Sequence, residues 1–391
     1  MSFSFEISPI VTDIKPSGIR KFFDMASEMT DVLSLGIGEP DFVTPWHIRD
    51  AGIMSLEKGQ TYYTSNAGLS ELRAELCTYF KRRFDLDYTP DQALITVGGS
   101  EAIDAAIRAL IVEDDEVIIP EPCFVCYEPI VRLAHGVPVP IITEEKDNFI
   151  LTPEKLKEKI TPKTKLLVLP YPNNPTGAIM TKAQLEAIAD VLKDTNVAVL
   201  SDEIYAELTY SGKHCSIANI PGMKERTIIV SGFSKAYAMT GWRLGFAVGD
   251  SAVIKAMIKI HQFAIMSSPT TAQYAAIEAL RNGDDDIAEM ASQYDERRRV
   301  LIDRLNEMGL TCFEARGAFY VFPSIKSTGL SSEEFCKRLL ETKKVAVIPG
   351  NAFGQSGEGH VRISYAYSLK TINKALDRMQ EFLNELKEEN K

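Results

Sequence analysis

The sequence predicts an α/β protein in which a mostly parallel sheet is flanked by helices, followed by a smaller α+β part. From about residue 90 to 250, short apolar runs alternate with amphipathic helical patterns. This alternation is typical of a parallel sheet that is covered on both faces. After residue 250, long helical segments come first and only short apolar runs follow. The strands expected in the first part are 93–97, 116–119, 137–142, 165–169, 197–201, 227–230 and 245–248.

Helices are expected between these strands, for example at 100–110, 153–160 and 181–193. Pro153 suits the first position of its helix, and Thr181 suits an N-cap. In the second part we expect helices at 251–265, 270–281 and 284–308, and short strands near 319–322, 345–348 and 360–365. We expect three parts. Residues 1–45 form an N-terminal arm and part of the small domain, residues 46–284 form the large cofactor-binding domain, and residues 285–391 form the rest of the small domain.

Composition and charge limit the kinds of partner that we expect for this protein. The net charge of the 391 residues is −11, which disfavours nucleic acid or an anionic membrane as the main partner. The chain has no apolar run of the roughly 20 residues that a membrane-spanning helix needs. Its first residues lack the basic start of a signal peptide, so we expect a cytoplasmic protein. Cys123 and Cys126 form a lone C-x-x-C without a second pair, and we expect free thiols and no metal site.

The densest cluster of reactive side chains is the segment from Ser231 to Gly245, which follows an expected strand. It contains Lys235 among small residues and, eight residues later, Arg243. A buried lysine has a lowered pKa and attacks carbonyl carbons readily, whereas the guanidinium fork of an arginine suits a phosphate. Taken alone, Lys235 also fits a surface lysine at the end of a strand.

Three further motifs follow other expected strands. Tyr171–Gly177 reads Tyr-Pro-Asn-Asn-Pro-Thr-Gly and predicts a tight turn that contains Asn174. Asp202 and Tyr205 close the strand at 197–201, where the carboxylate could cap a helix or contact a cationic ring. The Gly-Gly turn before Ser100 opens a helix, and backbone N–H groups at such a start bind phosphate.

Because ligands of parallel sheets bind at the carboxyl ends of the strands, one crevice could collect all four motifs. Together they supply an amine, a carboxylate, a phenol, an amide, a guanidinium and a phosphate cradle. This set matches pyridoxal 5′-phosphate: a lysine for the aldehyde, an acid for the pyridine nitrogen and donors for the phenolic oxygen.

These motifs together resemble the class I pyridoxal-phosphate-dependent aminotransferases, which have the aspartate aminotransferase-like fold called fold type I. The lysine segment looks like that family's attachment signature, and the Asn174–Gly177 turn looks like its second hallmark. The later His360-Val-Arg362-Ile-Ser also matches, so that the resemblance runs from Leu35 to Arg362. The Ser17–Phe22 start and the Leu169–Gly177 segment most resemble bacterial aromatic and N-acetyl-diaminopimelate aminotransferases.

The resemblance implies a role for each matching residue. Lys235, Asp202 and Tyr205 would be catalytic, with Lys235 holding the cofactor as an aldimine. Cofactor contacts are also implied for Gly99, Ser100, Glu101, Phe124, Asn174, Ser231, Ser234, Arg243 and, reaching a neighbouring subunit, Tyr63. Of the two serines, either one could touch the phosphate, because many relatives place that serine where Gly232 stands here. The substrate would be held by Gly38, Asn174 and Arg362, and the shared site implies a homodimer.

The resemblance predicts transfer of an amino group from an L-amino acid to a 2-oxo acid such as 2-oxoglutarate. Some aspartate enzymes carry a lysine where Ser100 stands, so we favour aromatic or other bulky donors. Residues Ile19, Phe22, Tyr62, Phe124 and Tyr320 could offer an apolar pocket for them. The alternatives are an aspartate or N-acetyl-diaminopimelate aminotransferase, a cystathionine-type carbon–sulfur β-lyase, a decarboxylase or racemase, and a ligand-sensing domain of a regulator.

Overall fold

The computed structural model describes residues 5–16, 18–19, 22, 25 and 29–389. Of the Ser17–Phe22 motif, Ser17, Arg20 and Lys21 lie outside the described residues. Within the described part of the chain, seven strands form one sheet in the order β2-β8-β7-β6-β5-β3-β4. Their bounds are Ala93–Thr96 (β2), Glu116–Glu121 (β3), Val137–Ile142 (β4), Thr164–Leu169 (β5), Ala198–Asp202 (β6), Thr227–Gly232 (β7) and Gly245–Val248 (β8).

The sheet is mostly parallel, which confirms the predicted fold class. Pairing is parallel from β4 through β3, β5 and β6 to β7, and only β8 pairs antiparallel with both of its neighbours. All seven expected strands are present, and their ends differ from the predicted ones by at most two residues.

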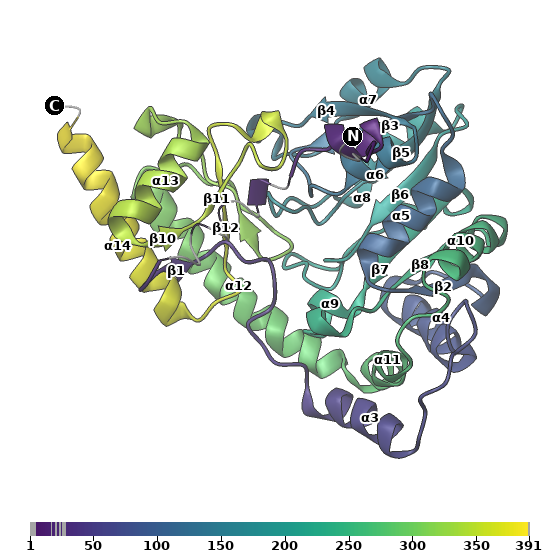
Figure 1. Cartoon of the computed structure of the whole chain (residues 1–391). Helices are drawn as coiled ribbons and strands as arrows, with labels where there is room; N and C mark the ends of the chain where they lie inside the picture. Colours follow the sequence, from purple (N-terminus) through teal and green to yellow (C-terminus); the bar gives the residue numbers. More distant parts are fainter. Residues whose placement is uncertain (1–4, 17, 20–21, 23–24, 26–28, 390–391) are drawn as a thin grey trace, which may run out of the picture.

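Both faces of the sheet are buried, because alternate residues of each strand point to opposite sides. In β5, Leu166 and Val168 pack with the helices α5, α6 and α10. Leu167 and Leu169 pack on the other face, in the core that contains α8. Figure 1 shows this layered arrangement, with α5 and α10 lying side by side.

The helices that cover the sheet begin where the sequence predicted. Thr181 is the N-cap of α8 and accepts a hydrogen bond from the Gln184 N–H, and Pro153 is the first residue of α7. The described helices of the first part are Pro9–Asp13 (α1), Trp46–Glu57 (α3), Ser70–Phe84 (α4), Gly99–Leu110 (α5), Tyr127–Leu133 (α6), Pro153–Lys159 (α7), Lys182–Leu192 (α8), Phe233–Ala236 (α9), Ser251–Ala264 (α10) and Thr270–Asn282 (α11). Among the residues described, no helix has the length and apolar character that crossing a membrane requires.

The C-terminal part contains three long helices and two small sheets. The helices are Asp284–Glu307 (α12), Ser332–Lys343 (α13) and Leu369–Glu389 (α14). Figure 1 shows α12 running from the neighbourhood of α11 to this part of the molecule. The strands are Leu33–Ser34 (β1), Tyr320–Val321 (β9), Val345–Ala346 (β10), Ile348–Pro349 (β11) and Val361–Ser364 (β12).

One predicted strand of this part is divided in the structure. Residues 345–348 were expected to form one strand, but β10 pairs with β1 and β11 pairs with β12. The chain therefore changes partners after Ala346, which an apolar pattern alone does not reveal. The pairing of β1 with β10 also joins the segment before residue 45 to the C-terminal part. The domain boundaries themselves stay a prediction.

Candidate active site

A cavity of about 670 Å³ lies at the carboxyl ends of the parallel strands. Residues that follow β2, β3, β5, β6 and β7 meet in this cavity. Ligands of parallel sheets usually bind at this edge. The predicted site residues that line this cavity are Gly38, Gly99, Ser100, Phe124, Asn174, Asp202, Tyr205, Ser234, Lys235, Arg243 and Arg362. Eleven predicted residues from seven separate segments therefore meet in one space.

The amine of Lys235 lies inside the cavity and donates a hydrogen bond of 2.6 Å to the Gly38 carbonyl. The short helix α9 presents it directly after β7. Burial lowers the pKa of this amine to about 8; the charges of Arg362 and Arg243 act in the same direction, and Glu39 opposes them. Because the neutral amine is the nucleophile, this shift makes Lys235 more reactive toward an aldehyde near neutral pH.

Asp202 ends β6 and is buried, with one carboxylate oxygen accepting a 2.6 Å hydrogen bond from the Tyr127 hydroxyl. Its other oxygen accepts the Ile204 N–H at 3.2 Å. Burial raises the pKa of Asp202 to about 6, although both hydrogen bonds favour the ionised form. A buried carboxylate is stabilised when a cationic donor lies beside it. The position of Asp202 therefore suits a protonated ring nitrogen.

Arg362, in β12, is buried and turned toward the cavity. Its Nη1 donates to the Asn174 side-chain oxygen at 2.9 Å and its Nη2 to the Gly36 carbonyl at 2.6 Å. Among the described residues, its buried Nε–H has no hydrogen-bond partner. A buried guanidinium with a free donor is suited to bind a carboxylate.

Two tyrosines form the wall between Asp202 and Arg362. The Tyr205 and Tyr320 hydroxyls lie 2.9 Å apart, and the guanidinium carbon of Arg362 lies 4.5 Å from the centre of the Tyr320 ring. A side chain at Gly38 would place its Cβ 2.4 Å from the Tyr320 hydroxyl, so this close approach requires glycine. The wall is therefore aromatic, with hydroxyl groups at its surface.

The opposite end of the cavity is formed by backbone rather than by buried side chains. Gly98 has a φ of +82° and caps α5, so the first N–H groups of the helix, from Gly99 onward, stay free for an anion. A Cβ at Gly98 would lie 2.6 Å from Nη2 of Arg243, which places this guanidinium beside the helix start. Ser100 and Arg243 are exposed. This end suits a phosphate group.

Three predicted residues do not line the cavity. The Glu101 carboxylate instead accepts the Val97 N–H and contacts Nδ1 of the buried His261 at 2.5 Å. The Ser231 hydroxyl donates to the Glu203 carbonyl, so that Ser234 is the serine on the cavity wall. Tyr63 lies on the surface with 82% of its area exposed.

The predicted apolar pocket is formed in part. Ile19, Phe124 and Tyr320 line the cavity, whereas Phe22 is packed in the core and Tyr62 is exposed on the surface. Tyr127 and Glu39 also line the cavity, although neither was predicted from the sequence. Tyr127 is the first residue of α6, whereas Phe124 lies before that helix, so no local spacing marked Tyr127 as a cavity residue.

The set of side chains fits a phosphorylated pyridine aldehyde such as pyridoxal 5′-phosphate. The amine of Lys235, the buried carboxylate of Asp202 and the anion-binding start of α5 line one cavity. The unused Nε–H of Arg362 leaves a donor for the carboxylate of a second molecule. The free cysteines, including Cys123 and Cys126, and the other potential ligands among the described residues form no group that could hold a metal ion.

Comparison with known proteins gives long matches. The family model described as aminotransferase class I and II matches residues 30–379. The Bacillus subtilis protein YugH, which carries the name of an aminotransferase, is 54% identical over 97% of this chain and 98% of its own. Aromatic-amino-acid aminotransferase 2 of Thermococcus litoralis is 46% identical over 96% of this chain and 97% of its own.

Relatives named for other substrates are similar to nearly the same degree. A Bacillus subtilis protein named for N-acetyl-LL-diaminopimelate is 44% identical over 96% of this chain and 95% of its own. The crystal structure of aspartate aminotransferase from Thermus thermophilus with maleate matches with a TM-score of 0.93 and 38% identity. That match covers 97% of this chain and 100% of the Thermus chain. These identities leave the substrate open.

Proposed function

Because this chain belongs to the class I and II aminotransferase family, we propose that it transfers an amino group from an L-amino acid to a 2-oxo acid such as 2-oxoglutarate. It is a transferase, and the cofactor of this family is pyridoxal 5′-phosphate. One observation carries the proposal: the Lys235 amine, with its lowered pKa, and the Asp202 carboxylate, with its raised pKa, line the same cavity.

In the proposal, Lys235 attaches the cofactor through a covalent bond to its aldehyde carbon. When bound, the cofactor supplies an electron-withdrawing ring that stabilises negative charge at the substrate α-carbon. When its amine is not bonded to the cofactor, Lys235 would be the base that takes the proton from the substrate α-carbon. Positioned general-base catalysis of this kind contributes roughly 10²- to 10⁴-fold to the rate.

The other cavity residues hold the ring and the phosphate. Asp202, held in place by Tyr127, keeps the ring nitrogen protonated. Asn174 and Tyr205, which line the same cavity, would donate to the phenolic oxygen, and Phe124 would contact the ring. The phosphate is bound at the helix start by contacts from Gly99, Ser100, Ser234 and Arg243.

Arg362 binds the substrate α-carboxylate, and Gly38 closes over it. Supporting this, the Nε–H of Arg362 is free, and its Nη1 bond to Asn174 aims the guanidinium at the cavity. The cationic side chains among the described lining residues are Lys235, Arg243 and Arg362. Since each of these has a role already, none remains for a second carboxylate. Together with the apolar side chain of Ile19, this favours aromatic or other bulky amino acids as donors.

The proposed assembly is a cytoplasmic homodimer with a shared site. Tyr63 does not line the cavity of its own chain, although the resemblance assigns it to a phosphate. Hydrogen bonds from Asn66 to the Met266 carbonyl and from Thr270 to the Tyr62 carbonyl join the loop of Tyr63 to the segment that begins at Ile265, and the apolar side chains of Tyr62, Ile265 and Met266 are exposed as well. Large exposed apolar patches mark interfaces, and a two-fold axis would bring each Tyr63 to the other subunit.

The test is a half-reaction screen with the purified, cofactor-loaded protein. Each amino acid is mixed with it alone, and absorbance reports conversion of the bound cofactor to its amine form. We expect phenylalanine, tyrosine and other bulky amino acids to convert it fastest, and 2-oxoglutarate to restore it. A response only to aspartate and glutamate would contradict the proposed donor class. Release of ammonia and pyruvate from cystathionine, without amino transfer, would instead identify a β-lyase.

A further inference from the structure

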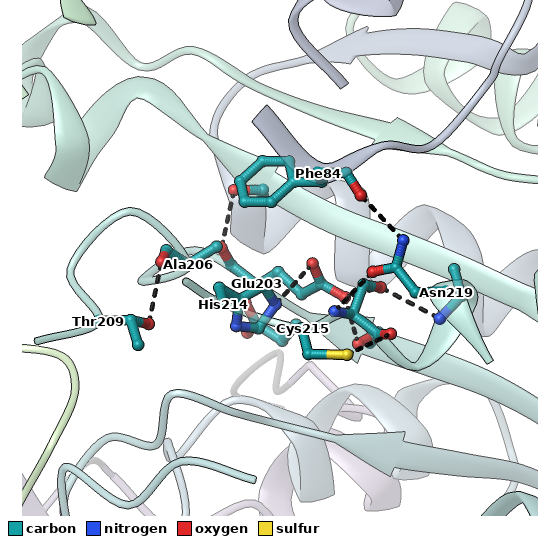
Figure 2. Close-up of polar contacts among 12 residues, drawn as sticks. Phe84, Glu203, Ala206, Thr209, His214, Cys215 and Asn219 are labelled. Carbon is teal, nitrogen blue, oxygen red and sulfur yellow. Dashed lines mark hydrogen bonds and ion pairs between the residues drawn. The ribbon is translucent and has the colours of Figure 1, made fainter. Parts of the chain in front are cut away.

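A cluster of buried polar side chains lies beside Asp202, on the side of the strand end that faces away from the cavity. Its centre is the carboxylate of Glu203, which is 3% exposed. One oxygen of this carboxylate accepts hydrogen bonds from the hydroxyls of Ser201, at 2.8 Å, and Ser216, at 2.5 Å. The other oxygen lies 3.0 Å from Nε2 of His214, whose side chain is 8% exposed. Figure 2 shows His214, Cys215 and Asn219 close to Glu203.

Neither of the two cavities considered among the described residues offers space for a ligand at this cluster. The cavity of about 670 Å³ is lined by Asp202 and Tyr205 but not by Glu203. The other cavity that Glu203 touches holds only about 10 Å³, roughly one water molecule. The cluster therefore acts on the site through the chain rather than by contact with substrate or cofactor.

The backbone connects the cluster directly to the two proposed ring contacts. The Glu203 N–H donates to the Val230 carbonyl of β7, and the Glu203 carbonyl accepts the Ser231 hydroxyl and the Ala206 N–H. Asp202 and Tyr205 stand one residue before and two residues after this anchored position. A shift of the backbone at Glu203 would therefore displace both Asp202 and Tyr205.

The far side of the cluster is anchored to other elements. Ser216 caps the short helix Ile217–Asn219 (η3), whose Asn219 donates to the Phe84 carbonyl at the end of α4. Figure 2 shows this hydrogen bond from Asn219 to Phe84. The Glu203 carboxylate thus joins the end of β6 to a capped turn and, through that turn, to α4.

The charge of Glu203 also reaches the site. The described titratable groups that it affects or contacts are His214, Asp202, Tyr88 and Cys215. At Asp202, burial raises the pKa most, and the negative charge of Glu203 raises it further. His214 is the basic side chain that pairs with the Glu203 carboxylate. A change in the charge of Glu203 would therefore change the electrostatic potential at Asp202, where the ring nitrogen would bind.

We infer that Glu203 is a positioning residue, whose carboxylate, held by Ser201, Ser216 and His214, fixes the turn that presents Asp202 and Tyr205 to the cofactor ring. This inference depends on the proposed function, because it assigns Asp202 and Tyr205 to that ring. It adds a residue outside the cavity to those that set the electronic state of the cofactor.

The test is Glu203→Gln in the cofactor-loaded protein, with Glu207→Gln as the matched control. Glu207 is a second glutamate of the same segment, with a side chain that is 7% exposed, but it pairs with Arg83 and Tyr79, away from the cavity. Each variant loses the charge of a carboxylate that accepts several hydrogen bonds, so both should unfold at a lower temperature than the wild type. The reporting measurements are the pH midpoint of the cofactor's absorbance change, and kcat and KM measured separately.

For Glu203→Gln we expect the pH midpoint to fall by roughly half a unit, because removing a negative charge makes a nearby proton easier to lose. We also expect kcat to fall about tenfold with KM nearly unchanged, as misplacement of catalytic groups typically gives. For Glu207→Gln both quantities should stay at the wild-type values. If the two variants behave alike, Glu203 is only structural and the inference fails.

Two further outcomes are distinguishable. If Glu203→Gln does not fold, His214→Leu is used in its place, because leucine fills the buried space but cannot donate to the Glu203 carboxylate. It should lower kcat without changing KM, and an unchanged kcat would overturn the inference. If the wild-type protein shows no pH-dependent cofactor absorbance at all, the proposed function fails first, whatever the variants do.

Discussion

The two ends of the cavity differ in what builds them. At the end formed by β6, Asp202 and Tyr205 are 6% and 4% exposed, and further hydrogen bonds hold Asp202 in place. At the end formed by α5, Ser100 and Arg243 are exposed, and a glycine turn sets the shape. The first end changes the pKa of its groups by burial, whereas the second offers backbone N–H groups and one exposed positive charge.

The difference assigns separate tasks to the two ends. A buried carboxylate interacts strongly with a ring charge, so the β6 end should control the rate of the chemical steps. An exposed arginine is screened by water, so the α5 end should control how tightly the cofactor is held. Substitutions at the two ends should therefore affect different quantities.

The largest effect among the substitutions of these two ends is expected for Asp202→Asn. Asparagine keeps the shape of the side chain but removes the charge that pairs with the ring nitrogen. Removing one partner of a buried ion pair costs about 3–5 kcal/mol, which corresponds to a rate loss of roughly 10²- to 10⁴-fold. Single-turnover kinetics of the half-reaction would measure this loss. The variant should still bind the cofactor, and near-normal turnover would contradict the role of Asp202.

A smaller effect, on a different quantity, is expected for Arg243→Gln. Because Arg243 is exposed, loss of its charge should weaken cofactor binding by only about tenfold. At saturating cofactor, kcat should stay within about threefold of the wild-type value. Fluorescence titration of the apoprotein would measure the affinity, and the difference from the wild type should shrink as salt is added. A large fall in kcat at saturation would show that the two ends do not have separate tasks.

The main sheet and most of the cavity could be predicted from the sequence. The strands around Val168 and Ile229 are continuous apolar runs, because both faces of the sheet are buried. Polar motifs then stand at the strand ends, where the topology of a parallel sheet brings them together. For this reason Asn174, Asp202 and Lys235 could be placed in one crevice without coordinates.

The features that the sequence did not reveal depend on tertiary contacts. The break after Ala346 comes from a change of strand partner, since β10 and β11 belong to different sheets. Glu101 follows the glycine turn, but its carboxylate turns back to His261, 160 residues away. Tyr127 reaches Asp202 across 75 residues, and Glu203 is held by a turn that begins 11 residues later. No local pattern specifies such partners.

In the proposed function, Lys235 forms the covalent bond to a cofactor whose ring lies against Asp202. Borohydride reduction of the holoprotein, followed by proteolysis and mass spectrometry of the peptides, tests it most directly. We predict that the yellow colour is lost on reduction and that one equivalent of pyridoxyl phosphate is found on the peptide containing Lys235. The Lys235→Ala variant should carry no such adduct. A stoichiometric adduct on another lysine of the wild-type protein would contradict the account.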